Sequence, residues 1–307
     1  MIYKIVHKTE YTYAEPASLC YNQARLLPRS VELPQLSQTC LNHNIFIEPP
    51  YTDYREHTDY FGNNVVYYTI RQPHTRTVIT ATSEVNIEPN TGAGESLFQC
   101  DAGRVAWEEV STRLLADKTP ATLEAREFTL NSPMISLFPE LADYAAPSFF
   151  ANRPVLEAVY NLGQRIFQDL EFVPGVTAIA TPLSEVLQKR RGVCQDYAHL
   201  MVGCLRAQGL AARYVSGYIE TVPPPGQEKL QGADASHAWC SVFVPELGWV
   251  DFDPTNNLIP SDQHIILGWG RDFSDVTPLK GVFFSTGNHK LKVSVDVIRI
   301  ETVDSNM

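Results

Sequence analysis

Residues Arg190–His199 carry the sequence Arg-Arg-Gly-Val-Cys-Gln-Asp-Tyr-Ala-His, and an apolar run from Leu200 to Leu210 follows them. The Gly-Val-Cys turn and the apolar run predict a helix that starts near Cys194, with Asp196 in its first turn. The first backbone N–H groups of a helix have no partner inside the helix, and the dipole is positive at this end. Both effects favour the thiolate, which is the nucleophilic form of cysteine. Cys194 is therefore a candidate nucleophile.

Two later stretches contain the other residue types that cysteine catalysis needs. Residues 236–239 are Ser-His-Ala-Trp, and residues 248–255 are Gly-Trp-Val-Asp-Phe-Asp-Pro-Thr. A catalytic thiol needs a nearby base and a third group that fixes the tautomer and orientation of the imidazole. If Ser236–Val244 and Gly248–Asp253 are neighbouring antiparallel strands, His237 and an aspartate lie side by side at one end. The pattern predicts acyl transfer by a cysteine nucleophile.

The second of these stretches offers two aspartates. Asp251 and Asp253 share strand parity, so spacing alone leaves both open as the partner of His237. A proline follows Asp253, which fits a strand that ends there. Trp239 lies on the same strand face as His237. Its role is either to shield the imidazole from solvent or to pack in the core.

Other thiols and imidazoles of this region are expected to be structural. Cys204 lies in the middle of an apolar helical run, and Cys240 faces opposite to His237 on its strand. His199 falls off the helix face that carries Cys194, because neighbours on one face are three or four residues apart.

Size and charge limit the class of protein. A chain of 307 residues suggests two domains or one large domain, and 44% hydrophobic with 19% charged residues is ordinary for a globular protein. The formal net charge of −11 argues against general nucleic-acid binding, because phosphate contacts need clustered Lys and Arg. The densest basic run, Lys189–Arg191, stops at three residues.

The sequence predicts neither a transmembrane helix nor a signal peptide, and it predicts no zinc site. The sequence contains no apolar run of about 18 residues, which a transmembrane helix would need. Met1–His7 lacks the apolar core and cleavage site of a signal peptide, so a cytoplasmic location is expected. The six cysteines then remain thiols, and none forms a CxxC pair, so a zinc site is not expected.

The order of predicted elements indicates an α+β chain in three parts. Residues 1–95 form the first part, an antiparallel β-sandwich of short strands such as Val65–Ile70 and Val78–Ile87, closed by a linker at 90–95. Residues 96–150 form a connecting region with helices at 104–116 and 137–146. Residues 151–307 form the catalytic domain, which includes strand-like runs at 282–285 and 291–301 in the tail.

The sequence resembles the bacterial transglutaminase-like proteins, a branch of the papain-like cysteine enzymes. The resemblance rests on the stretch around Cys194 and on several other short motifs that span nearly the whole chain. These motifs are residues 7–13 (His-Lys-Thr-Glu-Tyr-Thr-Tyr), 25–29 (Arg-Leu-Leu-Pro-Arg), 174–177 (Pro-Gly-Val-Thr), 213–218 (Arg-Tyr-Val-Ser-Gly-Tyr), 235–239 (Ala-Ser-His-Ala-Trp), 248–256 (Gly-Trp-Val-Asp-Phe-Asp-Pro-Thr-Asn) and 270–278 (Gly-Arg-Asp-Phe-Ser-Asp-Val-Thr-Pro).

The resemblance implies a fold and a site. The fold is an N-terminal β-domain followed by a papain-like core, in which a helix carries the cysteine and an antiparallel sheet carries the His and the Asp. The site is a Cys-His-Asp triad carried onto Cys194, His237 and Asp253, since the family's acid is the aspartate of the Asp-Pro-Thr motif. The activity implied is acyl transfer on peptide or carboxamide bonds without a cofactor or metal.

The reaction outcome is open between hydrolysis and amine transfer, with a peptide or protein as substrate. Animal transglutaminases carry an oxyanion-stabilising tryptophan upstream of the cysteine, and this chain has none between Trp107 and Trp239. The expectation is therefore a cysteine protease or amidase. The alternatives are a true protein-glutamine transglutaminase and a non-catalytic binding or scaffold protein.

Overall fold

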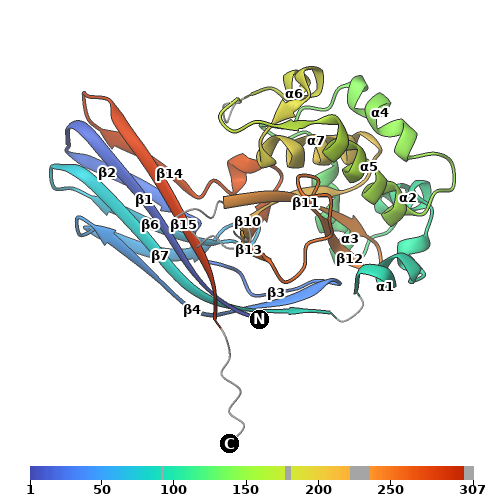
Figure 1. Ribbon diagram of the computed structural model, residues 1–307, viewed down its shortest axis with the longest axis horizontal. Helices are drawn as coiled ribbons and strands as arrows, with labels where there is room; N and C mark the ends of the chain where they lie inside the picture. Colours follow the sequence, from blue (N-terminus) through green and yellow to red (C-terminus); the bar gives the residue numbers. More distant parts are fainter. Residues whose placement is uncertain (91–92, 177–180, 222–235, 301–307) are drawn as a thin grey trace, which may run out of the picture.

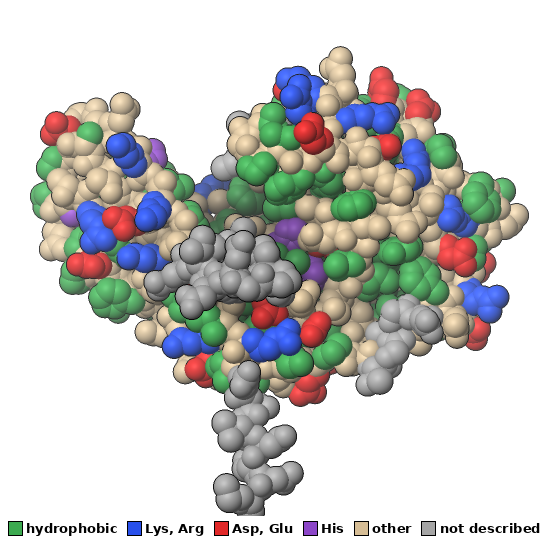
Figure 2. Space-filling view, in the orientation of Figure 1, with side chains coloured by type: hydrophobic (Ala, Val, Ile, Leu, Met, Phe, Trp, Pro, Cys, Tyr) green, Lys and Arg blue, Asp and Glu red, His purple; other side chains and the backbone are tan. Residues whose placement is uncertain are grey.

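The computed structural model describes residues 1–90, 93–176, 181–221 and 236–300. The chain forms a lobe of β-sheets and a second lobe in which helices pack on a small sheet (Figure 1). A notch in the surface separates the upper parts of the two lobes in the view of Figure 2.

The strands and helices alternate little along the chain, which is typical of an α+β fold. The strands are β1 (Ile2–Ala17), β2 (Leu19–Ala24), β3 (Val31–Glu32), β4 (Leu36–Glu48), β5 (Asp53–Thr58), β6 (Asn64–Ile70), β7 (His74–Pro89), β8 (Glu171–Phe172), β9 (Arg191–Gly192), β10 (Ala212–Ile219), β11 (Ser236–Val244), β12 (Gly248–Phe252), β13 (His264–Gly270), β14 (Leu279–Phe284) and β15 (His289–Ile300). The helices are α1 (Ala93–Gln99), α2 (Trp107–Ala116), α3 (Pro120–Ala125), α4 (Pro139–Ala145), α5 (Val155–Asp169), α6 (Leu183–Lys189) and α7 (Cys194–Ala207), with short 3-10 helices η1 (Ala102–Arg104), η2 (Arg126–Thr129), η3 (Ala146–Ser148) and η4 (Phe273–Asp275).

The β-sheet lobe is an antiparallel sandwich, as the sequence predicts. One sheet has the strand order β15-β1-β7-β4-β3, and the other has the order β14-β2-β6-β5. Side chains alternate between the faces of each strand, so every second residue of the early part of β1 is buried. Tyr13, Ile47, Tyr68 and Ile79 meet in one apolar cluster that joins strands of both sheets. This shared core holds the sandwich together.

The tail belongs to the sandwich rather than to the second lobe, which corrects the predicted 151–307 domain. Strand β14 pairs with β2, and β15 pairs with β1 in a register that runs from Ile2 opposite Ile300 to Tyr13 opposite His289. The alternating valines of the tail fit any half-buried strand, so their pattern does not specify a partner strand. In the structure Val295 and Val297 pack with Tyr3 of β1.

The predicted linker at 90–95 is helical from Ala93 on, and residues 91–92 lie outside the described residues. Strand β7 ends at Pro89 and helix α1 already begins at Ala93. The helices predicted at 104–116 and 137–146 are present as α2 and α4. Their buried residues Val110 and Leu141 share one apolar cluster with α5 and α7, so this region is a layer of the core rather than a separate domain.

The second lobe is built on helix α7 and the antiparallel sheet β12-β11-β10-β13. The predicted helix at Cys194 and the two predicted strands at 236–244 and 248–253 are present at nearly the predicted positions. Every residue of α7 from Asp196 to Arg206 is buried, which accounts for the apolar run. No helix in the described part of the chain has the length and apolar character to cross a membrane.

One buried cation fixes the end of α7. The Arg206 guanidinium, 2% exposed, donates to the carbonyl of Ala212 from Nε at 3.0 Å and to that of Arg271 from Nη2 at 2.6 Å. It also donates to the carbonyl of Leu130 at 3.0 Å. Burying a charge is costly unless its hydrogen bonds are made. These bonds tie the helix to the strand that follows it and to both flanking segments.

Candidate active site

The start of α7 is fixed by a carboxylate cap and a glycine. The backbone N–H of Val193 donates to Oδ2 of Asp196 at 2.8 Å, which satisfies one free donor of the first helical turn. A Cβ atom added to Gly192 would lie 2.5 Å from that same oxygen. Glycine is therefore required for the carboxylate to reach its position. The helix begins with Cys194 as its first residue.

Cys194 is half-buried and lies at the surface of a small apolar cluster. Its neighbours there include Ala198 of α7, Tyr214 of β10 and Ala238 of β11. The Cys194 backbone N–H donates to no acceptor within the described residues. The thiol and a free backbone donor therefore belong to the same residue at the positive end of the helix.

His237 and Asp253 are brought together by neighbouring strands. His237 stands at the start of β11, and its Nε2 lies 2.7 Å from Oδ2 of Asp253, just past the end of β12. The other carboxylate oxygen of Asp253 accepts the backbone N–H groups of Thr255 at 2.9 Å and Asn256 at 3.2 Å. The Asn256 side-chain amide donates to Oδ2 of Asp253 at 2.7 Å. These bonds hold the carboxylate in one orientation toward the imidazole.

The electrostatics of the pair favour the charged forms. Burial opposes protonation of His237, but hydrogen bonds and charge interactions with Asp253 and Cys194 raise its pKa from 6.5 to about 10. Burial opposes ionisation of Asp253, but hydrogen bonds from His237 and His264 hold the pKa of this carboxyl well below its usual range. An imidazolium is therefore held between an ionised carboxylate and the Cys194 thiol. Since Nε2 faces Asp253, Nδ1 is the nitrogen left for proton exchange with sulfur.

Asp251, which the strand parity leaves open as a partner, serves another residue. Its Oδ2 accepts the indole N–H of Trp239 at 2.9 Å, and burial raises the pKa of its carboxyl. Trp239 is fully buried, and its ring centroid lies 5.9 Å from that of His237. Asp251 thus positions the tryptophan that packs beside the imidazole, whereas Asp253 contacts the imidazole itself.

A second histidine on Asp253 is missing from the sequence-based site. His264, at the start of β13 and 1% exposed, places Nε2 at 3.0 Å from Oδ2 of Asp253. No short motif surrounds His264, and only the pairing of β13 with β10 brings it to the carboxylate. Its one available sequence signal is a histidine at the beginning of an apolar strand.

The same three side chains form a set that could hold a metal ion. The ligand atoms of His237, Asp253 and His264 lie within 4.8 Å of one another. Sequence spacing does not indicate this set, because the three residues lie in separate segments that only the sheet brings together. Each of these atoms already takes part in a hydrogen bond inside the group, so a metal would have to replace those bonds.

The residues expected to be structural lie in the core. Cys204 and Cys240 are fully buried, and burial raises the pKa of both thiols. His199 accepts the backbone N–H of Phe273 at 3.2 Å, and burial lowers its pKa to about 4. A neutral imidazole that accepts a backbone bond has a packing role.

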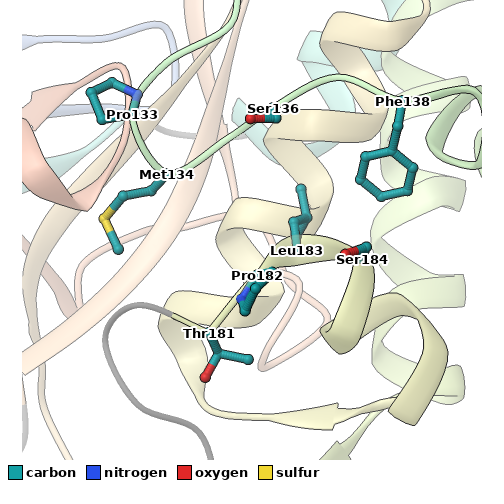
Figure 3. A pocket seen from close by; sticks show the side chains of 8 residues that line it. All are labelled: Pro133, Met134, Ser136, Phe138, Thr181, Pro182, Leu183 and Ser184. Atoms are coloured by element: carbon teal, nitrogen blue, oxygen red, sulfur yellow. The ribbon is translucent and has the colours of Figure 1, made fainter.

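A cavity of about 300 Å³ lies beside α7, and Cys194 is not among the residues that line it. The segment 133–138 and the beginning of α6 line it, and Figure 3 shows Met134 and Leu183 on its two sides. Leu183 packs on Gly203, because a Cβ atom there would lie 2.8 Å from Leu183 Cδ2. At a rise of about 1.5 Å per residue, Gly203 and Cys194 are roughly 13 Å apart along the helix. The Leu183 side of this cavity therefore lies beside the far part of α7.

Comparison with known proteins agrees with this architecture. Residues 3–86 match the bacterial transglutaminase-like N-terminal region, and residues 145–254 match the transglutaminase-like superfamily. The crystal structure of a proposed cysteine protease from Cytophaga hutchinsonii superposes with a TM-score of 0.71 at 19% identity, covering 99% of this chain and 92% of that chain. At this identity the likeness shows a shared fold.

Some relatives match this chain over nearly its whole length, and others match only a short region of it. An uncharacterized protein of Mycobacterium bovis is 38% identical over 304 residues, which cover 97% of this chain and 93% of that protein. A protein-glutamine gamma-glutamyltransferase of Pseudomonas aeruginosa is 40% identical over 72 residues, or 23% of this chain and 11% of that protein. With both family regions present and a full-length relative at this identity, the chain belongs to the bacterial transglutaminase-like family.

Proposed function

We propose that the chain is a cysteine-nucleophile acyl-transfer enzyme that acts on peptide or carboxamide bonds and releases its product by hydrolysis. The observation that supports this most directly is the imidazole of His237, held by Asp253 on one side and in contact with the Cys194 thiol on the other. Nucleophile, base and orienting acid are the three parts that cysteine catalysis requires. A scaffold protein has no need for such an arrangement.

Each residue of the proposed triad has one task. The Cys194 sulfur attacks the carbonyl carbon, and the backbone N–H of Cys194 donates to the oxygen that becomes negative. His237 delivers its proton to the leaving nitrogen as the C–N bond breaks, which leaves an acyl thioester on Cys194. Water then attacks the thioester, its proton passes to His237, and the acid and free thiol are released. Asp253 keeps the imidazole oriented throughout.

Water rather than an amine is proposed as the acceptor. The chain has no tryptophan between Trp107 and Trp239, the region in which animal transglutaminases carry their oxyanion-stabilising tryptophan, so one feature of a dedicated crosslinking site is absent. The Cytophaga hutchinsonii structure with the same fold carries the name of a proposed cysteine protease. The relative from Pseudomonas aeruginosa is named as a glutamyltransferase, so amine transfer is the second outcome to measure.

A cytoplasmic location is proposed on the chemistry of the thiols. All six cysteines are free thiols. Cys40 and Cys100 are only half-buried, as is Cys194, and they have still formed no disulfide. Free thiols persist in a reducing compartment. Fractionation of bacteria that express the natural sequence tests this: recovery with periplasmic proteins would contradict it.

The reaction is tested by incubating the protein with a library of peptides that contain glutamine and asparagine. Mass spectrometry distinguishes cleavage of a peptide bond from loss of ammonia at a side-chain amide, and added cadaverine distinguishes transfer from hydrolysis. We expect products with water as acceptor and a transient acyl adduct on Cys194.

The matched controls are Cys194→Ala, which removes the nucleophile, and Cys204→Ala, which removes a buried core thiol. Turnover by Cys194→Ala, or no acyl adduct with any substrate that wild-type protein converts, contradicts the proposal. Exclusive formation of cadaverine conjugates contradicts the hydrolase assignment but retains the acyl enzyme.

A further inference from the structure

A second cavity, of about 490 Å³, lies away from the candidate triad. Its walls come from three parts of the fold: the sandwich segments around Arg29 and Phe61, the helical layer around Glu127, and the catalytic sheet at Arg213 and Trp249. Cavities of about 300 to 1,000 Å³ with aromatic walls are typical of small-ligand sites. None of Cys194, His237 and Asp253 lines it.

Stacked arginine and tryptophan side chains form one wall. The guanidinium carbon of Arg213 lies 4.2 Å from the ring centroid of Trp249 and 3.8 Å from that of Trp269. Arg29 places its guanidinium carbon 3.6 Å from the centroid of Trp269. Two cations at such distances from one ring must occupy its opposite faces. Cation–π contact of this kind favours charged guanidinium groups in a partly desolvated place.

Arg213 has no hydrogen-bond acceptor among the described residues. Arg213 is 3% exposed, it lines the cavity, and its Nε is buried without a partner among the described residues. Burial lowers its pKa to about 9, against the opposing charge of Asp251. Arg29, by contrast, donates to the carbonyl of Phe61 at 2.7 Å and to the side chain of Asn63 at 2.9 Å. A buried guanidinium without acceptors is costly, and a carboxylate is the group that matches its donors.

Carboxylates on the other walls prevent a simple anion from binding well. Glu124 of α3, Glu127 of η2 and Glu32 of β3 all line the cavity. Burial raises the pKa of Glu127, and the charge of Arg271 acts against that rise. The three glutamates of the lining, of which Glu32 and Glu124 are exposed, outnumber its two arginines, which favours a ligand that carries a positive group as well as a negative one.

We propose that this cavity, the Arg–Trp pocket, binds a small zwitterion that places a carboxylate on Arg213, an ammonium among Glu32, Glu124 and Glu127, and an apolar group against the aromatic rings. This is the chemistry of a free amino acid or of an unblocked dipeptide. The pocket adds a binding function to the chain that is independent of the proposed hydrolysis.

The pocket is tested by isothermal titration calorimetry on full-length Cys194→Ala, in which the proposed nucleophile is absent and turnover cannot consume the probe. The probes are L-leucine, leucyl-leucine, N-acetyl-leucyl-leucine and leucyl-leucine amide. We expect saturable binding of L-leucine or leucyl-leucine and at least about a tenfold loss with the amide, because the charge-assisted bonds to Arg213 are lost. The affinity for the acetylated probe should also be lower, because this probe lacks the ammonium group. If L-leucine binds and leucyl-leucine does not, the ligand class is a free amino acid. If leucyl-leucine binds and L-leucine does not, the ligand class is an unblocked dipeptide.

Variants assign the binding to the pocket. Arg213→Gln should abolish the preference for the free carboxylate over the amide. Because loss of a buried cation can disturb folding, Glu124→Gln combined with Glu127→Gln provides an independent test: it should abolish the preference for the free amine over the acetylated probe. Glu157→Gln, an exposed residue of α5, is the matched control and should bind like the parent. No saturable binding of either zwitterion, or equal affinity for free and blocked probes, overturns the proposal.

Discussion

His237 places Nε2 at 2.7 Å from Oδ2 of Asp253, although His237 stands at the start of β11 and Asp253 follows the end of β12. The strands β11 and β12 run antiparallel, so the start of one lies beside the end of the other. The bond occupies Nε2 and turns Nδ1 away from the carboxylate. The proposed chemistry at Cys194 depends on that orientation.

Replacing the two aspartates separates orientation from packing. Asp253→Asn should lower kcat/KM by roughly a thousandfold to ten-thousandfold, because an amide cannot stabilise the imidazolium or hold its tautomer. Asp251→Asn keeps an acceptor for Trp239, so folded protein should retain activity within about tenfold while its unfolding free energy falls by about 1–3 kcal/mol. Steady-state kinetics with a substrate from the peptide library and urea unfolding measure both. Equal kinetic effects would remove the distinction between the two residues.

His264 should tune the acidity of Asp253. Its hydrogen bond and charge lower the pKa of that carboxyl, so His264→Phe should raise it. The stability that the ionised Asp253 carboxyl contributes at neutral pH should then be smaller, and urea unfolding should show it lost at a higher pH on acidification. His57→Phe, at an exposed position of β5, is the control. A difference in unfolding free energy from wild-type protein that stays constant on acidification would show that His264 has only a packing role.

The raised pKa of His237 predicts how stability changes with pH. The pKa is 6.5 in the unfolded chain and about 10 in the folded one, so the folded state binds the proton more tightly. The stabilisation is therefore complete below pH 6.5 and is lost as pH rises through about 10. The difference in unfolding free energy between wild-type protein and His237→Gln should shrink over this interval in urea titrations. A constant difference would contradict the ion pair.

The cap of α7 requires a glycine before it. Gly192→Ala places a methyl group against the Asp196 carboxylate and should lower stability by about 1–3 kcal/mol, the range typical of a lost cap with steric strain. Activity should fall with it, because the cap positions the first residue of the helix. Gly163→Ala in α5 is the contrasting control: the new methyl group meets only Met201, at 3.5 Å, and should stabilise the helix by roughly 0.5–1 kcal/mol. Thermal unfolding measures the stability of both variants. A Gly192→Ala variant as stable as wild-type protein would contradict the requirement for glycine.

Local sequence predicted the parts of the site that local structure determines. The start of α7 follows from the motif around Cys194, and the strand ends follow from the motifs around His237 and Asp253. The choice between Asp251 and Asp253 came from the resemblance to the family, since both aspartates face the same side of one strand. The structure shows the physical difference: one carboxylate accepts from an indole and the other from an imidazole.

Relationships across the fold could not be predicted in this way. His264 reaches Asp253 through the pairing of β13 with β10, and β15 reaches β1 through a register that joins the two ends of the chain. The local sequence predicts neither pairing, because a strand with alternating apolar residues can pair with many other strands. The Arg–Trp pocket is assembled from three distant segments, so the local sequence does not predict it either.

The activated state of Cys194 is the central claim, and a brief pulse of limiting iodoacetamide at mildly acidic pH tests it most directly. Mass spectrometry locates the label, and the half-buried Cys40 and Cys100 are internal controls, because ordinary thiols are protonated and slow at that pH. We predict selective alkylation of Cys194 that is lost in His237→Ala. Slow labelling of several cysteines to a similar extent, unchanged by that substitution, would contradict the account.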